Sequence, residues 1–172
     1  MTTSTPSATA TDRLEALGFT LPPVGDGAKY VEHRSLGSSV YVSGQLPFKD
    51  GVLQGQGTVG RDVELEAARD LARHAVVNCL AIAAEAVGGL DRVRIVQMLV
   101  FVASTPDFGK QSRVADAASD LLIEVLGENG RHARTAIGVA GLPLNSPVEI
   151  QMVCTTAQAR AIPSFSDRQS KE

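Results

Sequence analysis

The pattern of apolar and polar positions predicts strands at both ends of the chain. Alternating side chains favour two short strands at 29–37 and 38–44, followed by a hairpin across 48–55 whose turn is an Asp-Gly pair. Residues 93–104 are apolar at both alternating sets of positions, which is typical of a strand that is covered on both faces. The last two strands are expected within 131–153.

Apolar side chains at spacings of three and four predict two long amphipathic helices between these strands. The first is expected to begin at Asp62, as its N-cap, and to end at the glycine pair that starts with Gly88. The second opens with Thr105 as N-cap and Pro106 at its first helical position, and it ends at Gly127. The two helices therefore precede and follow the apolar strand.

The composition of the two ends differs from that of the middle. The start is rich in Ser, Thr and Ala, and the end is polar without periodicity, so we expect both to be mobile. A short helix that follows the start is expected to have its N-cap at Thr11 or Asp12. The expected organisation is a disordered N-terminus at 1–11, one domain at 12–158 that begins with a short helix at 12–18, and a flexible tail at 159–172.

The order of these elements indicates an α+β fold with a single sheet. Two amphipathic helices can cover one face of that sheet. The strands around Leu99 and Ile137, however, carry apolar or small residues on both faces. An apolar patch of that size is a liability in a monomer, so we predict a homo-oligomer whose sheets pack against one another.

Charge and composition exclude several classes of protein. The net charge is −3, and no basic cluster with interleaved aromatic residues is present, which disfavours nucleic acid as a partner. No basic and apolar leader precedes the domain, and no apolar run reaches the roughly 20 residues of a membrane span, so we expect a cytoplasmic protein. Cys79 and Cys154 fall on apolar phases without CxxC spacing and are interpreted as reduced core thiols.

Two motifs that resemble ligand sites are better explained otherwise. The segment GQGTVG at 55–60 matches a dinucleotide-binding pattern, but a hairpin precedes it and no acidic residue is placed to bind ribose. The three histidines lack the spacing of metal ligands, so no metal site is expected. His33 and His74 are interpreted as solvated, whereas strand alternation places His132 beside Arg134.

Arg134 and Glu149 are charged residues within the most apolar strands. Arg134 shares its strand face with the small residues Ala136, Gly138 and Ala140, which suggests space for a ligand, and a guanidinium suits a carboxylate. Glu149 is a candidate general base or water-holding residue. The alternative is that the two residues form a buried ion pair with each other, or that either one pairs elsewhere. If the last two strands form a hairpin that turns near Leu142, the two residues lie opposite each other; a turn at Leu144-Asn145 offsets them by roughly 20 Å.

Three segments, YV…LGSSVYVSGQLP, FVASTPDF and HARTAIGVAGLPLNSPVEIQM, resemble the RidA (YjgF/YER057c/UK114) family from about Tyr30 to Thr156. The resemblance implies a chorismate mutase-like homotrimer with ligand sites in intersubunit clefts. It also implies hydrolysis of reactive 2-enamino and 2-imino acids, such as 2-aminoacrylate, to 2-oxo acids and ammonia, without a cofactor or metal. By position, Arg134 matches the arginine that binds the substrate carboxylate, and Glu149 matches the acidic residue associated with the attacking water. Tyr30, Ser43 and Gly44 match residues that line the same pocket.

Two positions depart from the family pattern. Ala136 stands where many members have Cys, and Asp116 is the nearest match to an Asn that commonly lines the cleft. A negative Asp116 would compete for Arg134 or reject an anionic substrate. The N-terminal helix is similar to that of a less characterised bacterial subgroup. A trimer that only binds a small carboxylate metabolite remains the main alternative to an enzyme, and an endoribonuclease or translation inhibitor is a third, which the negative charge disfavours.

Overall fold

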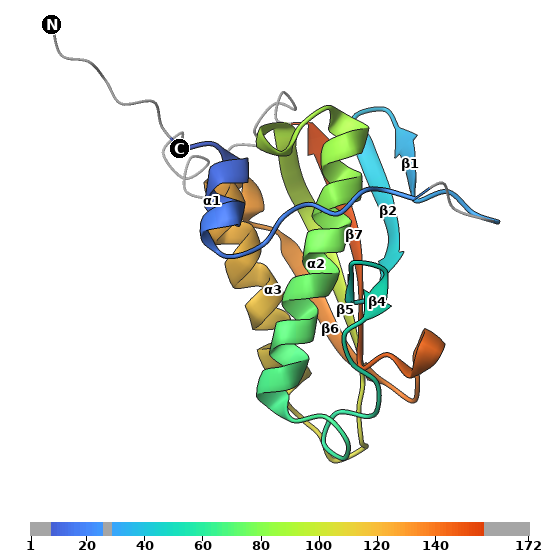
Figure 1. The fold of residues 1–172 in the computed structure, drawn as a ribbon. Helices are drawn as coiled ribbons and strands as arrows, with labels where there is room; N and C mark the ends of the chain where they lie inside the picture. The colour runs from blue at the N-terminus through green and yellow to red at the C-terminus, as the bar shows by residue number, and fades with distance from the viewer. Residues whose placement is uncertain (1–7, 26–28, 157–172) are drawn as a thin grey trace, which may run out of the picture.

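The computed structural model describes residues 8–25 and 29–156 (Figure 1). Within these ranges the elements agree in type and order with the pattern of the sequence. Three short 3₁₀ helices, Leu90–Arg92, Gly127–Gly130 and Pro143–Asn145, connect some of them. The helices and strands are α1 Ala10–Ala16, β1 His33–Leu36, β2 Ser39–Gln45, β3 Phe48–Lys49, β4 Val52–Leu53, α2 Leu65–Val87, β5 Val93–Ala103, α3 Gln111–Leu126, β6 Ala133–Val139 and β7 Val148–Thr156.

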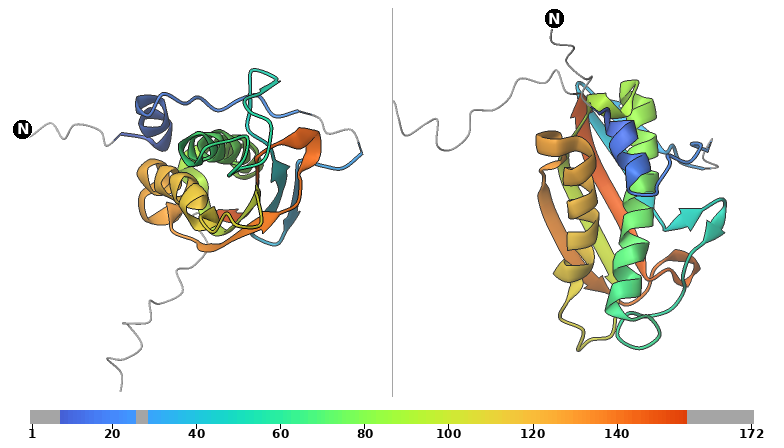
Figure 2. Two further views of the ribbon diagram at one scale, coloured as in Figure 1. Left: turned by 90° about the horizontal axis from the view of Figure 1, so that it is seen from below. Right: turned by 60° about the vertical axis from the view of Figure 1, so that its left-hand side comes forward.

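One five-stranded sheet forms the centre of the fold, in the order β1-β2-β7-β5-β6. Strand β5 pairs antiparallel with β7 and parallel with β6, and the other pairs of this sheet are antiparallel. The last two strands therefore lie on either side of β5 and do not form a hairpin with each other. Strands β3 and β4 form a separate small hairpin. Helices α2 and α3 cover one face of the large sheet (Figure 2).

The core lies between this face and the two helices. Alternate residues of β5, including Met98, Val100 and Val102, are fully buried there. Helix α2 presents Ala68, Ala72 and other small side chains to the same core, which lets the helix approach the sheet closely. Each fully buried Val or Leu side chain contributes about 1.5–3 kcal/mol relative to an exposed one. The amphipathic pattern thus selects the covered face.

The opposite face of the sheet has no cover among the described residues. Cross-strand rows on this face include Tyr41, Val153, Leu99, Phe101 and Ile137. Tyr41 and Ile137 remain 45% and 43% exposed. The expectation of an apolar, uncovered sheet face is confirmed.

Three helix starts differ from the expected positions. Helix α1 begins at Ala10 because Thr9 is the N-cap: Thr9 Oγ1 accepts a hydrogen bond from Asp12 N at 3.1 Å, and Thr9 N donates to Asp12 Oδ2 at 2.8 Å. Of the residues expected to be disordered, Ala10 and Thr11 thus belong to this helix and Thr9 caps it. The expectations for 1–7 and for the tail at 159–172 lie outside the described residues.

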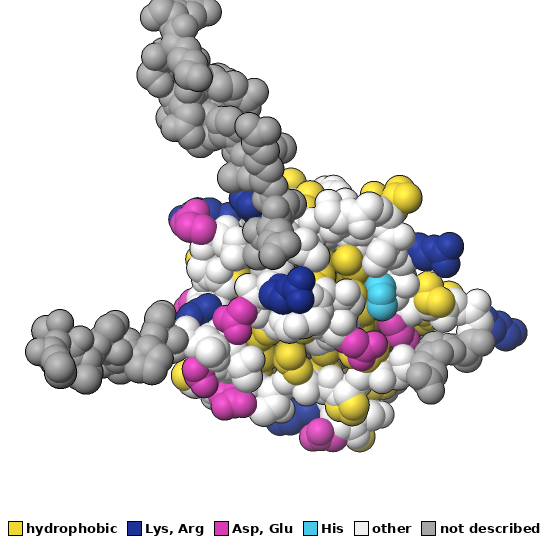
Figure 3. Space-filling view, turned by 90° about the horizontal axis from the view of Figure 1, so that it is seen from above, with side chains coloured by type: hydrophobic (Ala, Val, Ile, Leu, Met, Phe, Trp, Pro, Cys, Tyr) yellow, Lys and Arg dark blue, Asp and Glu magenta, His cyan; other side chains and the backbone are white. Residues whose placement is uncertain are grey.

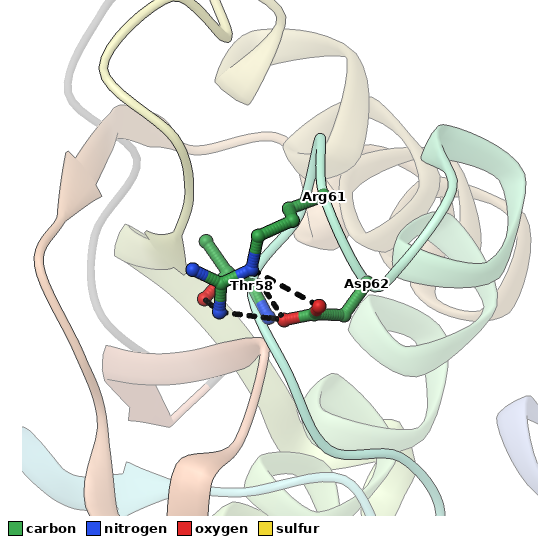
Figure 4. A network of polar contacts seen from close by, with 3 residues as sticks. All are labelled: Thr58, Arg61 and Asp62. Carbon is green, nitrogen blue, oxygen red and sulfur yellow. Dashed lines mark hydrogen bonds and ion pairs between the residues drawn. The ribbon is translucent and has the colours of Figure 1, made fainter.

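Helices α2 and α3 begin later than expected, at Leu65 and Gln111. Asp62 does not cap α2, because its carboxylate accepts hydrogen bonds from Thr58 N at 2.9 Å and from the Arg61 guanidinium (Figure 4). Pro106 lies in a turn in which Phe108 N donates to the Thr105 carbonyl at 3.1 Å. In both cases a residue type that is common at helix starts stabilises the loop that precedes the helix instead.

Residues 17–25 form an N-terminal strap that crosses α2 from α1 towards the edge strand β1 (Figure 1). Phe19, Leu21 and Val24 of the strap pack against the core. Helix α1 is held on α3 by the buried Leu14 and by Arg13 Nε, which donates to the Val125 carbonyl at 2.7 Å. The N-terminal segment is therefore an integral part of the domain.

Candidate functional site

Arg134 lies on the edge strand β6 and points to the helical side of the sheet. Its cross-strand partner is Met98, which is fully buried against the helices. Its Nη1 donates to Asp116 Oδ1 at 2.9 Å and to Ser119 Oγ at 3.0 Å, both on α3. The side chains of Arg134 and Asp116 are 25% and 46% exposed. Asp116 thus pairs with Arg134, and competition with a substrate for this arginine stays a prediction.

A chain of hydrogen bonds through His132 and Ser119 holds Arg134 in place. His132 Nδ1 lies 2.6 Å from the Gly130 carbonyl, and its Nε2 lies 3.1 Å from Ser119 Oγ. Because a carbonyl only accepts, the neutral ring carries its hydrogen on Nδ1, and Nε2 accepts from the Ser119 hydroxyl. Ser119 Oγ then accepts from Arg134. The expectation that His132 flanks this arginine is confirmed.

The guanidinium of Arg134 keeps one binding edge available. Among the described residues its hydrogen bonds are made by Nη1, so Nε and Nη2 remain as a side-on fork of the kind that binds a carboxylate with two hydrogen bonds. A shallow cavity of about 210 Å³ lies beside it. Its lining consists of Ser119, Ile123, Arg131, His132 and Arg134.

The predicted ligand space along Ala136 to Ala140 is wrong in position. Ala136 packs against the core, and a Cβ at Gly138 would lie 2.9 Å from Gln111 Nε2 and from Ser104 Oγ. The small residues therefore accommodate the start of α3. The observed space lies towards the other end of β6, next to His132.

Glu149 lies on β7 and points to the opposite, uncovered face. Its strand neighbours Val148 and Ile150 are fully buried against the helices, so alternation turns Glu149 away from them. Its carboxylate rests on Gly44, where an added Cβ would lie 2.0 Å from Oε1. Partial burial raises the pKa of Glu149 above its ordinary value. A carboxylate with a raised pKa is a stronger base than an ordinary one and is better suited to accept a proton.

The other residues matched to the family pocket gather near Glu149. Ser43 Oγ donates to the Val31 carbonyl at 2.7 Å, which ties the end of β2 to the segment before β1. Tyr30, directly before this contact, is exposed. Gly44 thus contacts Glu149, and Ser43 links this end of β2 to Val31, the residue after Tyr30, whereas Asp116 and Ala136 lie on the helical face with Arg134.

The fold separates these two groups of residues. Arg134 pairs with Met98 and Glu149 with Phe101, on opposite sides of β5 and on opposite faces of the sheet. Two strand spacings and three residues separate their backbones, or about 10 Å across and about 10 Å along the sheet. Both hairpin alternatives and the ion pair between Arg134 and Glu149 are wrong, whereas the alternative that one of the two pairs elsewhere is confirmed for Arg134, which pairs with Asp116. Within one chain the two side chains do not face one ligand.

The GQGTVG loop does not have the geometry of a nucleotide site. Gly57 N donates to the Asn145 carbonyl at 2.8 Å and Val59 N to the Ala103 carbonyl at 2.8 Å, so these amides serve the protein itself. The preceding element is the β3–β4 hairpin, as expected. The loop is a structural connection.

The remaining chemically reactive residues are structural. Burial raises the pKa of Cys154 to about 11 and that of Cys79 further, so neither thiol is a nucleophile. His74 packs edge-on against Phe19 at 5.3 Å and is half-buried, so its interpretation as a solvated residue is wrong. Within residues 8–25 and 29–156, no group of three His, Cys, Asp or Glu side chains is placed to hold a metal.

Surface charge is mixed where it is visible. Figure 3 shows one end of the molecule, on which basic and acidic side chains are interspersed and form no continuous basic area. No helix in the described part of the chain is long and apolar enough to cross a membrane.

Ser119 is the site residue that sequence reasoning missed. It lies three positions after Asp116 on α3, so both side chains project from the same face of the helix towards Arg134. That spacing was visible in the sequence. What was missing is which face of α3 meets β6.

Known proteins resemble this chain over most of its length. The family model described as "YjgF/chorismate mutase-like, putative endoribonuclease" matches residues 11–155. Protein TCP17 of Trypanosoma cruzi is 42% identical over 142 residues, which is 80% of this chain and 88% of that protein. A crystal structure of an Agrobacterium tumefaciens protein of unknown function is 42% identical, with a TM-score of 0.80 over 86% of this chain and 92% of that one. A Shewanella oneidensis structure named a putative endoribonuclease is 31% identical, with a TM-score of 0.82 over 86% and 99%. The predicted chorismate mutase-like α+β fold is confirmed.

Proposed function

The chain belongs to the YjgF/chorismate mutase-like family, which is the RidA family that the sequence resembles. On that premise we propose that it hydrolyses 2-enamino and 2-imino acids of the 2-aminoacrylate type in clefts between the subunits of a homotrimer. The observation that carries this proposal is the division of the matched residues. Arg134 and Glu149 occupy opposite faces of one sheet, so they contribute to a common site only when two chains meet. The uncovered apolar face supplies a surface for that contact.

Each residue has a chemical role in this proposal. The side-on fork of Arg134 binds the substrate carboxylate and fixes the neighbouring imine carbon, which is already electrophilic. An enamine first tautomerises to the imine, as its terminal carbon gains a proton and its nitrogen loses one. Glu149 accepts a proton from a water as that water's oxygen bonds to the imine carbon, and the nitrogen takes up a proton from solvent. The protonated Glu149 then gives its proton to the nitrogen that leaves, while the new hydroxyl loses its proton to solvent. The C–N bond of the resulting carbinolamine then breaks, which releases ammonia and leaves the 2-oxo acid. No redox step occurs.

Asp116 is compatible with this role. It binds only through Nη1 of Arg134, and nearly half of its side chain is exposed, so solvent screens its charge. Together with Ser119 it holds the guanidinium in one orientation, with Nε and Nη2 left for the substrate. Asp116 is thus a positioning residue that lowers, but does not cancel, the positive charge.

Turnover of an enamine tests the proposal. 2-Aminoacrylate is generated in situ, and formation of the 2-oxo acid is followed with and without the protein. Arg134→Ala and Glu149→Gln should each lower the enzymatic rate by about 100-fold or more. Arg73→Ala serves as the matched control, because Arg73 is also paired with an acidic residue, Asp70, and lies on α2, outside the lining of the cavity beside Arg134. Hydrolysis no faster than the spontaneous rate would refute the enzyme.

A non-catalytic carboxylate-binding protein is the second candidate. The pairing of Arg134 with Asp116 favours it, because a partly neutralised arginine suits reversible binding. Such a protein would bind pyruvate at Arg134, with loss of binding in Arg134→Ala, but would leave the enamine half-life unchanged. The same turnover experiment therefore separates the two functions.

A further inference from the structure

A second cavity lies on the far side of α2 from Arg134. It has a volume of about 520 Å³, within the range of small-molecule sites. The N-terminal strap closes one side, the β3–β4 hairpin another, and α2 forms the floor. Its apolar lining includes Pro22, Val24, Phe48, Ala81 and Ile82. Arg134 lies on β6 at the opposite edge of the sheet. Gln45, which lines the cavity, pairs with Ile150 on the helical face, whereas Glu149 points to the other face, so the sheet separates this cavity from both proposed catalytic residues.

Asn78 supplies a buried polar group to this cavity. The residue is only 9% exposed, and its Nδ2 donates to the carbonyls of Leu46 at 2.8 Å and Phe48 at 3.0 Å. Both hydrogens of the amide are used, and because carbonyls only accept, the orientation of the amide is fixed. In the described part of the chain, Oδ1 of Asn78 accepts no hydrogen bond. It is an available acceptor on a largely buried side chain that lines the cavity.

The other polar groups of the cavity also present acceptors. Gln45 Nε2 donates to Glu32 Oε2 at 3.1 Å and to the Ser43 carbonyl at 3.3 Å, so its two hydrogens are also used. Glu32 retains its second oxygen, and Asp50 adds a carboxylate at the exposed rim. The nearest lysine of the hairpin, Lys49, lines a neighbouring, smaller cavity. The side chains of the larger cavity thus offer negative charge and acceptors to a ligand, because the N–H donors of Asn78 and Gln45 already make hydrogen bonds within the protein.

We propose that this cavity binds a small organic cation with an apolar body, such as a primary ammonium. An ammonium brings three donors and a positive charge to Asn78 Oδ1, Glu32 and Asp50, while its hydrocarbon part contacts Phe48, Ile82 and the strap. An anion of the same shape would find two carboxylates and no side-chain donor. A neutral ligand would satisfy the acceptors without the charge interaction. The site is independent of the proposed deaminase activity.

Binding of three probes that share a 2-phenylethyl group to the full-length protein tests the site. The probes are 2-phenylethylammonium, 2-phenylethanol and 3-phenylpropionate, and binding is followed by ¹H–¹⁵N NMR. We expect the cation to shift the side-chain amide signals of Asn78 and Gln45 and to bind at least tenfold more tightly than the alcohol. The anion should leave both signals unchanged. Equal affinities for cation and anion, or shifts confined to residues around Arg134, would overturn the proposal.

Charge-removing variants identify the carboxylates. Glu32→Gln still accepts the hydrogen bond from Gln45, and Asp50→Asn keeps a residue that tolerates the positive φ of 50° at this turn, so both should fold. Together they should weaken cation binding at least fivefold and leave 2-phenylethanol unaffected. Glu85→Gln, which removes a charge from an exposed position of α2, should change neither. Unchanged cation binding in the double variant would refute the assignment.

Discussion

Gly44 controls where the carboxylate of Glu149 lies. A Cβ at this position would be 2.0 Å from Glu149 Oε1 and 3.0 Å from its carboxyl carbon, whereas ordinary contacts begin at 3.4 Å. In Gly44→Ala the carboxylate must therefore move by about 1.4 Å. The backbone at Gly44 is outside the left-handed region, so alanine introduces no backbone strain there. The substitution moves a proposed catalytic group while the rest of the fold is retained.

We expect Gly44→Ala to lower kcat for enamine hydrolysis by about 100-fold, since a misplacement of about 1 Å has effects of this size. The free energy of unfolding should change by less than about 1 kcal/mol, because the displaced group is the end of a flexible side chain. Turnover is measured with 2-aminoacrylate generated in situ, and stability by urea unfolding. Gly141→Ala is the control, because a Cβ there meets nothing within 4 Å. A fully active Gly44→Ala enzyme would show that hydrolysis does not depend on the position of Glu149.

Three further predictions address stability, pH and substrate binding. In Gly130→Ala the Cβ would lie 2.1 Å from the Leu122 carbonyl oxygen, a backbone atom that cannot rotate away. The free energy of unfolding, measured in urea, should therefore fall by about 2–3 kcal/mol. An unchanged unfolding midpoint would contradict this close approach of Gly130 to α3. Burial raises the pKa of Glu149, so its protonated form stabilises the folded state. This contribution to the free energy of unfolding is complete below the pKa of the unfolded state and is lost as the pH rises through the pKa of the folded state. Over the same interval kcat/KM should rise, and Glu149→Gln should remove both pH dependences. Asp116→Asn keeps an acceptor for Arg134 Nη1 but removes a negative charge. At roughly 6 Å from a bound carboxylate in water, repulsion by this charge weakens substrate binding by about 0.7 kcal/mol, so KM should fall about threefold with kcat unchanged. A higher KM would mean that binding needs the charge of Asp116.

Local signals identified most of the elements but misplaced some of their starts. Glycine in the left-handed conformation ends α2 at Gly88, as the sequence predicted, because few other residues adopt that geometry. Asp62 and Pro106 are equally good start signals by type, yet both serve loops. A capping residue acts only if the chain around it continues into the helix, and that depends on contacts formed elsewhere. The start of a helix is therefore less local than its end.

The composition of the candidate site was visible in the sequence, but its geometry was not. Arg134 and Glu149 were recognised because charges within apolar strands are costly unless they have partners or a role. Both predicted arrangements assumed that β6 and β7 form a hairpin. The structure inserts β5 between them, because a parallel β5–β6 pair and an antiparallel β5–β7 pair bury the apolar strand on both edges. Strand order depends on long-range pairing, which alternation does not encode.

The sequence by itself determined the period of each element, the apolar face of each helix and strand, and the family. These follow from side-chain chemistry at fixed spacings of two and about 3.6 residues. The tertiary structure decided which strands neighbour β5, that Arg134 and Glu149 point to opposite faces, and that the donors of Asn78 and Gln45 are spent inside the protein. Those relations join residues far apart in the chain. They exist only once the sheet, the two helices and the N-terminal strap are packed together.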